Sequence, residues 1–120
     1  MNFLDGDVDA RERSFAGRSL RLPLGVEALS RLQGREKVTL GVRPEDVRLS
    51  FTESERGFPA RIYVTEALGN ETFVFLRLDQ EKLIARTDPA LRADIESTVW
   101  ISFDESKLHF FDQKSGERVS

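Results

Sequence analysis

Hydrophobic and polar residues alternate with a period of two along much of the chain. The alternation is clear in residues 37–42, 60–65 and 99–103. Because successive side chains of a β-strand point to opposite faces, each stretch predicts a half-buried strand. Residues 18–24 alternate in the same way, but Pro23 cannot donate to a β-ladder, which places them at a sheet edge or strand end. Residues 72–78 are apolar on both faces, which predicts a more central strand.

Two short stretches have helical spacing instead. Residues 26–32 end before Gly34, and residues 88–95 begin with Asp88 as a cap and Pro89 at the first helical position. The apolar residues of the first stretch lie at i, i+3 and i+6, namely Val26, Leu29 and Leu32. Seven or eight strands with one or two helical turns predict an all-β fold, a small antiparallel barrel or sandwich.

The composition narrows the class of protein. With 120 residues and 39% hydrophobic content, residues 1–120 are expected to form one domain with its own core. The chain has no cysteine, which excludes disulfides and thiolate metal sites. The net charge of −3 is the wrong sign for a dedicated nucleic-acid surface. Without a signal-peptide pattern or a long apolar run, we expect a soluble intracellular domain.

The stretch LGVRPEDVRLS, residues 40–50, interrupts an alternating pattern at an Arg-Pro-Glu step. Pro44 disfavours helical backbone angles at Arg43 and removes a ladder donor, so the strand must turn there. Glu45 and Asp46 are then placed to accept backbone hydrogens in the turn. The step is predicted to be a structural corner.

A second joint lies in EALGNETF, residues 66–73. Gly69 and Asn70 tolerate positive φ and suit a two-residue hairpin turn. Glu66 and Glu71 flank this turn, so the alternative function of the joint is to present acidic groups to a partner.

Little in the chain supports catalysis. His109 is the one histidine, and without cysteine or a Gly-x-Ser-x-Gly elbow no catalytic triad can be argued. The Gly-x-x-x-x-Gly-Lys-Ser/Thr phosphate loop is absent from the sequence, so we expect no ATP binding by this chain itself. Asp5, Asp7 and Asp9 alternate and form either a solvated face or a cation site, the former being the simpler interpretation. His109 shares a strand face with Phe111, which favours a packed or interface histidine.

Four stretches resemble a known family in order and spacing. They are MNFLDGDV at the start, LGVRPEDV at 40–47, EALGNET at 66–72 and HFFDQKSGERV at 109–119. Together they resemble the C-terminal regulatory segment of the ATP-binding subunits of carbohydrate ABC importers of the maltose and glycerol-phosphate type. That segment is the transport-associated OB (TOBE) domain. The resemblance covers nearly the whole chain, but residues between Asp9 and Arg35 match it in strand pattern only.

The resemblance implies a non-catalytic domain that regulates the ATPase subunit and holds two subunits together. It implies that ATP and Mg bind in a nucleotide-binding domain upstream and that Met1 is an internal residue. Residues 113–120 are expected to be a loose tail. The implied partners are a second copy of the subunit, the permease subunits, and a regulatory protein or small molecule. The implied location is cytoplasmic, at the inner face of the membrane. The candidate interface residues are Arg43, Glu45, Glu66, Asn70, Glu71, His109, Phe111 and Asp112, with Pro44 and Gly69 as structural turns.

A stand-alone OB-like barrel that binds an oligosaccharide or oxyanion is the alternative. Trp100 and Tyr63 are its candidate platforms, although partial burial is the simpler role for each. Nucleic-acid binding is disfavoured by the net charge and by the lack of a basic stripe with interleaved aromatics. The phenylalanines that such a stripe would need are interpreted as core, namely Phe73, Phe75, Phe110 and Phe111. An enzyme is the third alternative.

Overall fold

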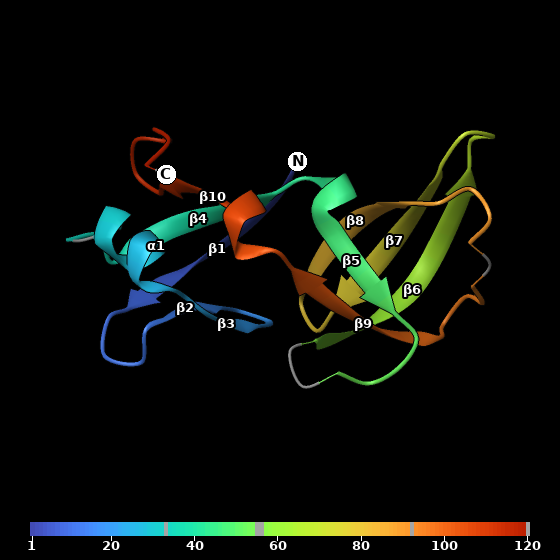
Figure 1. Ribbon diagram of the computed structural model, residues 1–120, viewed down its shortest axis with the longest axis horizontal. Coiled ribbons are helices and arrows are strands. Elements are labelled where there is room, and N and C mark those ends of the chain that lie inside the picture. The colour runs from blue at the N-terminus through green and yellow to red at the C-terminus, as the bar shows by residue number, and fades with distance from the viewer. Residues whose placement is uncertain (33, 55–56, 92, 120) are drawn as a thin grey trace. The chain divides into compact units, whose positions relative to one another are not determined.

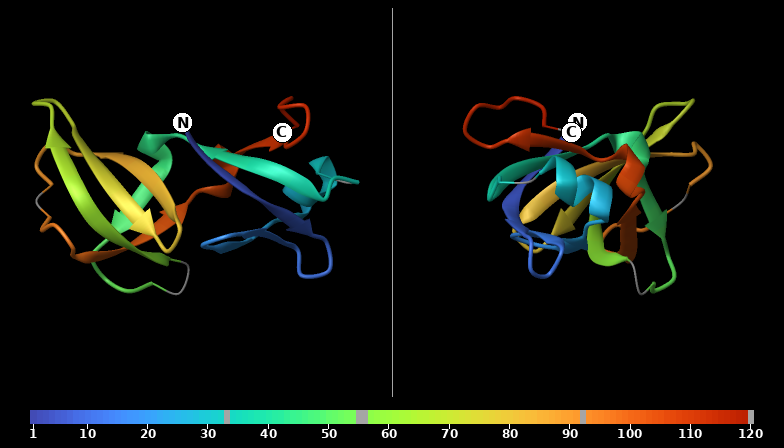
Figure 2. Two further views of the ribbon diagram at one scale, coloured as in Figure 1. Left: turned by 180° about the vertical axis from the view of Figure 1, so that it is seen from behind. Right: turned by 60° about the vertical axis from the view of Figure 1, so that its left-hand side comes forward.

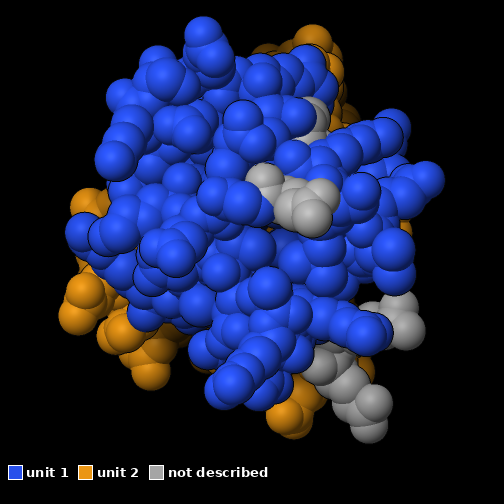
Figure 3. All heavy atoms as spheres, turned by 90° about the vertical axis from the view of Figure 1, so that its left-hand side faces the viewer, with its two compact units in different colours: residues 1–42, 105–120 blue, residues 43–104 orange. Residues whose placement is uncertain are grey.

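The computed structural model describes residues 1–32, 34–54, 57–91 and 93–119. Within these residues it has ten strands, one α-helix and two 3₁₀ helices. The chain divides into two compact units, which Figure 3 shows in blue and orange. Unit 1 comprises residues 1–42 and 105–120, and unit 2 comprises residues 43–104. Each unit contains one five-stranded antiparallel sheet.

The sheet of unit 1 has the order β10-β4-β1-β2-β3 (Figure 1). Its strands are β1 (Asn2–Asp9), β2 (Ser14–Gly17), β3 (Arg21–Pro23), β4 (Lys37–Val42) and β10 (His109–Asp112). Helix α1 (Val26–Arg31) lies between β3 and β4, and the 3₁₀ helix η2 (Glu105–Lys107) precedes β10. Pro23 lies in the edge strand β3, as the missing N–H donor predicts.

Two phenylalanines lie at the centre of the unit 1 core. Phe15 and Phe110 are 0% and 1% exposed, and their rings meet edge to face with centroids 6.4 Å apart. Gly6 makes room for the first ring, because a Cβ at residue 6 would lie 2.5 Å from Phe15 Cζ. The aliphatic residues buried around them are Leu4, Leu20, Leu24, Leu32, Val38, Leu40, Val42 and Leu108.

The predicted helix at 26–32 is confirmed as α1, and Gly34 after it has φ +80°. Its expected apolar face is buried in part only. Leu32 is 1% exposed, whereas Val26 is 77% exposed. The first turn therefore projects an apolar side chain into solvent.

The sheet of unit 2 has the order β5-β9-β6-β7-β8 and curves into a half-barrel (Figure 2). Its strands are β5 (Val47–Ser50), β6 (Phe58–Ala67), β7 (Thr72–Leu78), β8 (Glu81–Thr87) and β9 (Thr98–Phe103). The 3₁₀ helix η1 (Pro44–Asp46) precedes β5 and packs near β8. Strand β7 lies between β6 and β8, which confirms its predicted interior position.

The inner face of the half-barrel is aliphatic. Its buried residues are Val47, Ala60, Ile62, Val74, Leu76, Leu78, Leu83, Ala85, Val99 and Ile101. Phe73 and Phe75 alternate with the buried Val74 and are half-buried on the opposite face. Their interpretation as core residues is wrong, because β7 has apolar residues on both faces but fully buries only the face that contains Val74. Among the four phenylalanines, Phe110 is the buried one and Phe111 is half-buried.

The predicted all-β, antiparallel class with few helical turns is confirmed. The described residues form ten strands, whereas the sequence predicted seven or eight. The predicted helix over 88–95 is wrong, because Asp88 caps an isolated turn there, and Arg92 lies outside the described residues. The Ala90 N–H donates to Asp88 Oδ1 (2.7 Å) and the Leu91 N–H to the Asp88 carbonyl (3.0 Å). Ile95 is 52% exposed, so little apolar burial supports a longer helix.

Residues 113–119 follow β10 and return along it. The Asp112 N–H donates to the Glu117 carbonyl and the Val119 N–H to the Phe110 carbonyl, both at 2.8 Å. Arg118 forms an isolated antiparallel bridge with Phe111. The prediction of one domain over residues 1–120 with a loose tail stays a prediction.

Candidate functional site

The Arg-Pro-Glu step forms the corner that the sequence predicts. Arg43 is extended (φ −73°, ψ 147°), and Pro44 occupies the first turn of η1. The Asp46 N–H donates to the Arg43 carbonyl (2.9 Å), and the strand resumes at the buried Val47. Pro44 suits the first helical position because it has no N–H to satisfy there. The corner is therefore explained by backbone structure, while the Arg43 side chain is exposed.

The Gly69–Asn70 joint forms the predicted hairpin turn between β6 and β7. Gly69 has φ +88°, and the Leu68 N–H donates to the Glu71 carbonyl (2.8 Å). A glycine with positive φ at the first loop position matches a type II′ turn, whose twist suits flanking strands. Glu66 and Asn70 are exposed at this end of the hairpin.

Arg86 of β8 brings the two joints of unit 2 together. Its Nε lies 3.2 Å from Glu71 Oε2, and its Nη2 lies 3.8 Å from Glu45 Oε2. All three side chains are between 27% and 43% exposed, so solvent weakens each ion pair. The carboxylates of Glu45 and Glu71 therefore contact an arginine within unit 2, whereas Arg43, Glu66 and Asn70 are exposed.

The solvent-facing side of the unit 1 sheet gathers apolar side chains around Gly41. Phe3 and His109 lie directly opposite Gly41 in the two neighbouring strands. A Cβ at residue 41 would lie 2.7 Å from Met1 Sδ and 2.9 Å from Phe111 Cε2, so these side chains cover the glycine. The rings of Phe3 and Phe111 meet edge to face at 5.8 Å. Met1, Phe3 and Phe111 are called the Phe3 face below.

Sequence reasoning found Phe111 but missed the other two residues of the Phe3 face. Phe3 is 60% exposed and Met1 is 48% exposed. The signal was available, because Phe3 alternates with Asn2 and Leu4, which are buried in β1. His109 lies beside this face, and its Nδ1 is 2.8 Å from Arg118 Nη2.

Asp112 organises the turn after β10. Its Oδ1 accepts the N–H groups of Lys114 (2.9 Å) and Ser115 (3.0 Å), and its Oδ2 lies 3.6 Å from Arg35 Nε. The Ser115 and Lys114 backbone donors lower the pKa of the Asp112 carboxyl below its ordinary value, with smaller contributions from the Ser115 hydroxyl and Arg35. Asp112 therefore has a structural role in this turn.

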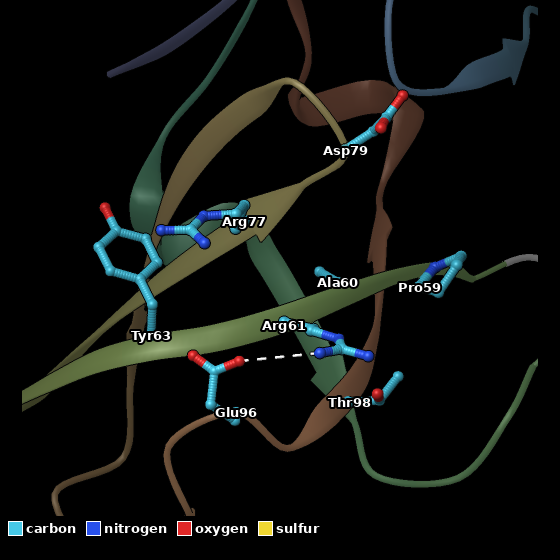
Figure 4. A pocket seen from close by; sticks show the side chains of 8 residues that line it. All are labelled: Pro59, Ala60, Arg61, Tyr63, Arg77, Asp79, Glu96 and Thr98. Atoms are coloured by element: carbon cyan, nitrogen blue, oxygen red, sulfur yellow. Dashed lines mark ion pairs between the residues drawn. The ribbon is translucent and has the colours of Figure 1, made fainter.

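The two platform candidates both lie in unit 2 and are half-buried. Trp100 lies in β9 opposite Pro59 of β6. Tyr63 lies in β6 and lines a hollow of about 530 Å³ together with Arg61, Arg77 and Glu96 (Figure 4). Two basic and two acidic residues line this hollow, namely Arg61, Arg77, Asp79 and Glu96.

Two further expectations concern metals and membranes. In the part of the chain that the structure describes, His, Asp and Glu side chains form no cluster of three that could hold a metal ion. Asp5 instead accepts the Thr39 hydroxyl (2.6 Å), and Asp9 Oδ2 lies 3.6 Å from Arg21 Nη1.

No helix among the described residues is long and apolar enough to span a membrane.

Comparisons with known proteins agree with the sequence resemblance. Residues 1–47 match the family model of the MalK OB fold domain. The sn-glycerol-3-phosphate import ATP-binding protein UgpC of Salmonella paratyphi A is 36% identical over 120 residues, and that of Escherichia coli K12 is 35% identical. Each alignment covers 99% of this chain and 33% of the relative, so the chain spans about a third of these proteins.

One solved structure and a second family model also match this chain. The cytoplasmic molybdate-binding protein ModG, solved with molybdate bound, superposes with a TM-score of 0.70 over 91% of this chain and 94% of its own. At 13% identity this shows a shared fold and supports the OB-like prediction. Residues 40–111, which include both joints of unit 2, match the model of the TOBE domain. The chain belongs to the TOBE domain family.

Proposed function

We propose that this chain is the non-catalytic regulatory and dimerisation domain of the ATP-binding subunit of an ABC-type sugar importer. The observation that carries the proposal is the alignment of 99% of the chain with one third of an import ATP-binding protein. The chain itself has no phosphate loop. ATP and Mg are then bound by another part of the subunit, which is cytoplasmic and reaches the inner face of the membrane through the permease subunits.

The proposed partner of the domain is a second copy of the same subunit. The Phe3 face supports this partner, because Phe3 and Met1 expose apolar area that a second copy would remove from water at about 25 cal/mol per Å². A two-fold axis brings the same patch together on both copies, so one apolar face suffices. Of the other candidate residues, His109 lies beside this face in unit 1, whereas Arg43, Glu66 and Asn70 are candidates for a separate contact of unit 2.

Pairing of the separate domain is expected to be weak. In a complete subunit, contacts elsewhere hold the two domains near each other, and tethering corresponds to effective concentrations of about 1 mM. A small interface, below about 1,200 Å² of total buried area, is then enough. Regulation follows if a protein or metabolite binds one arrangement of the pair more tightly than another.

Analytical ultracentrifugation of the 120-residue chain at about 1 mM tests the pairing. We expect a concentration-dependent dimer that Phe3→Ser abolishes, because the substitution removes an exposed ring from the proposed interface. Val26→Ser is the matched control, since Val26 is 77% exposed but lies in α1, outside the Phe3 face. A wild-type chain that sediments as a monomer, or equal loss of the dimer in both variants, contradicts self-pairing through this face.

The stand-alone barrel that binds a small ligand is the second candidate function. The observation that favours it is the hollow beside Tyr63, which contains Arg61 and Arg77. ModG, which shares the fold, is described as molybdate-binding. The gene sequence separates the two candidates, because a phosphate loop encoded upstream in the same frame supports the transporter subunit and an independent start supports the stand-alone binder.

A further inference from the structure

Three basic side chains lie in a row across neighbouring strands of unit 2. Lys82 of β8 is directly opposite Arg77 of β7, and Arg77 is directly opposite Arg61 of β6. Directly paired residues of antiparallel strands point to the same face, and all three are exposed. We call Lys82, Arg77 and Arg61 the cation row. Thr98 of β9 continues the same row beyond Arg61.

This arrangement has an electrostatic cost that ion pairs among the described residues offset only at Arg61. Like charges directly opposite each other on a sheet are destabilising. The ion pair of Arg61 Nη1 with Glu96 Oε2 is 3.7 Å long and joins side chains that are 67% and 63% exposed, so it contributes little. Among the described residues, no carboxylate forms an ion pair with Arg77 or Lys82. The positive charge is concentrated here although unit 2 has more acidic than basic residues.

A β-bulge places an aromatic ring beside two of these cations. The register of β6 against β7 shifts between Ile62 and Val64, so Tyr63 is the extra residue. The Tyr63 ring centroid lies 5.3 Å from Arg77 Cζ and 5.3 Å from Lys82 Nζ. Both distances are within cation–π range. The bulge thus holds two positive groups beside one ring, on the face that carries the hollow.

The side chains around the hollow leave the guanidinium groups accessible. Figure 4 shows Arg77 directed toward Tyr63, and Arg61 directed toward Glu96 and Thr98. Asp79 also lines the hollow, but its carboxylate is directed away from both arginines (Figure 4). Glu96 is therefore the carboxylate of the lining that competes with an anion for the row.

We propose that the cation row binds the phosphate group of a small phosphorylated ligand. Arg77 and Lys82 both lie at the Tyr63 ring, so a phosphate oxyanion there can meet the planar fork of the one and the point charge of the other, while Arg61 of the next strand adds positive charge. The phosphate also offsets the mutual repulsion of the three side chains. The hollow of about 530 Å³ is larger than one phosphate group, so a phosphate monoester fits with its organic part beside Tyr63. This site does not depend on the regulatory and dimerisation function; it rests on the second candidate function, ligand binding at the hollow beside Tyr63, and names the ligand class.

Titration calorimetry on the 120-residue chain tests the site with two probes, inorganic phosphate and phenyl phosphate, at constant ionic strength adjusted with chloride. We expect both to bind and to raise the melting temperature, because they bind the folded state. The double variant Arg77→Gln, Lys82→Gln should lower the affinity at least about tenfold. The matched control is Arg11→Gln, Lys107→Gln, which removes the same charge from exposed positions of unit 1 and should leave the affinity unchanged.

The probes and variants separate the possible outcomes. Tighter binding of phenyl phosphate assigns the site to monoesters, and equal binding assigns it to phosphate itself; both support the cation row. Glu96→Gln should raise the affinity, because it removes the competing carboxylate from Arg61. In chloride the double variant should melt close to wild type, because it removes opposed like charges and also two exposed cation–π contacts with Tyr63, and these effects oppose each other. The proposal is overturned if neither probe binds, if the control loses as much affinity as the row variant, or if Glu96→Gln binds no more tightly.

Discussion

The two units of this chain contain similar antiparallel sheets with different side chains on them. Unit 1 buries the Phe15 and Phe110 rings in its core, whereas the buried core of unit 2 is aliphatic. The solvent-facing sides of the two sheets also differ. Unit 1 exposes the apolar Phe3 face, and unit 2 exposes the cation row beside Tyr63. The inner faces stabilise each unit, and we propose that the outer faces bind different partners, an apolar surface for unit 1 and an anion for unit 2.

The units also form their turns by different means. In unit 2 the hairpin turn depends on a backbone angle that glycine adopts easily, at Gly69. In unit 1 the turn after β10 depends on a side chain, because Asp112 accepts two backbone N–H groups. Substitutions should therefore affect unit 2 through conformational strain at its turn and unit 1 through lost hydrogen bonds at its turn.

The largest expected effect comes from the unit 1 core. Phe15→Ala should lower the free energy of unfolding by about 3–5 kcal/mol, because it leaves a cavity against Phe110 and Gly6. Phe111→Ala is the control on the outer face, where a half-buried ring should cost about 1 kcal/mol. Urea denaturation measures both. Equal costs would contradict the difference in burial between the inner and outer faces of unit 1.

A smaller effect is expected at the hairpin turn of unit 2. Gly69→Val should lower the free energy of unfolding by about 1–2 kcal/mol through strain at positive φ. No heavy atom lies within 4 Å of a Cβ built at residue 69, so steric overlap adds nothing. Asn70→Ala at the neighbouring exposed position should change stability by less than about 0.5 kcal/mol. Thermal or urea unfolding measures both, and a neutral Gly69→Val would remove the conformational explanation of this turn.

The smallest effect concerns pH and the turn of unit 1. The pKa of Asp112 is lowered in the folded state by the Ser115 and Lys114 backbone donors, so its carboxylate stabilises the fold above its ordinary pKa of 3.8. That contribution is lost as the pH falls through the lowered value. The stability advantage of wild type over Asp112→Asn should therefore shrink on acidification from about pH 5 to about pH 3. Urea titrations at several pH values check this, and parallel pH profiles for the two proteins would contradict it.

Local chemistry made part of the candidate site predictable. Pro44 and Gly69 restrict their own backbone angles or those of a neighbour, so the corner and the hairpin turn could be located from single residues. The ion pairs of Arg86 with Glu45 and Glu71 could not, because they depend on which strands become neighbours. The predicted helix over residues 88–95 does not form for a related reason. Its caps are local signals, but a helix also needs an apolar partner surface, and Ile95 remains exposed.

The sequence by itself determined the all-β class, most strand positions and the two joints, because period-two alternation and the angles of proline and glycine are local properties. The tertiary structure decided which face of β7 is buried, which strands adjoin, and which side chains meet across them. The cation row exists only because β6, β7 and β8 pair in one register and a bulge at Tyr63 shifts that register by one residue. Pairing between strands is set by the whole sheet, so no local pattern specifies the residues that lie opposite Arg77.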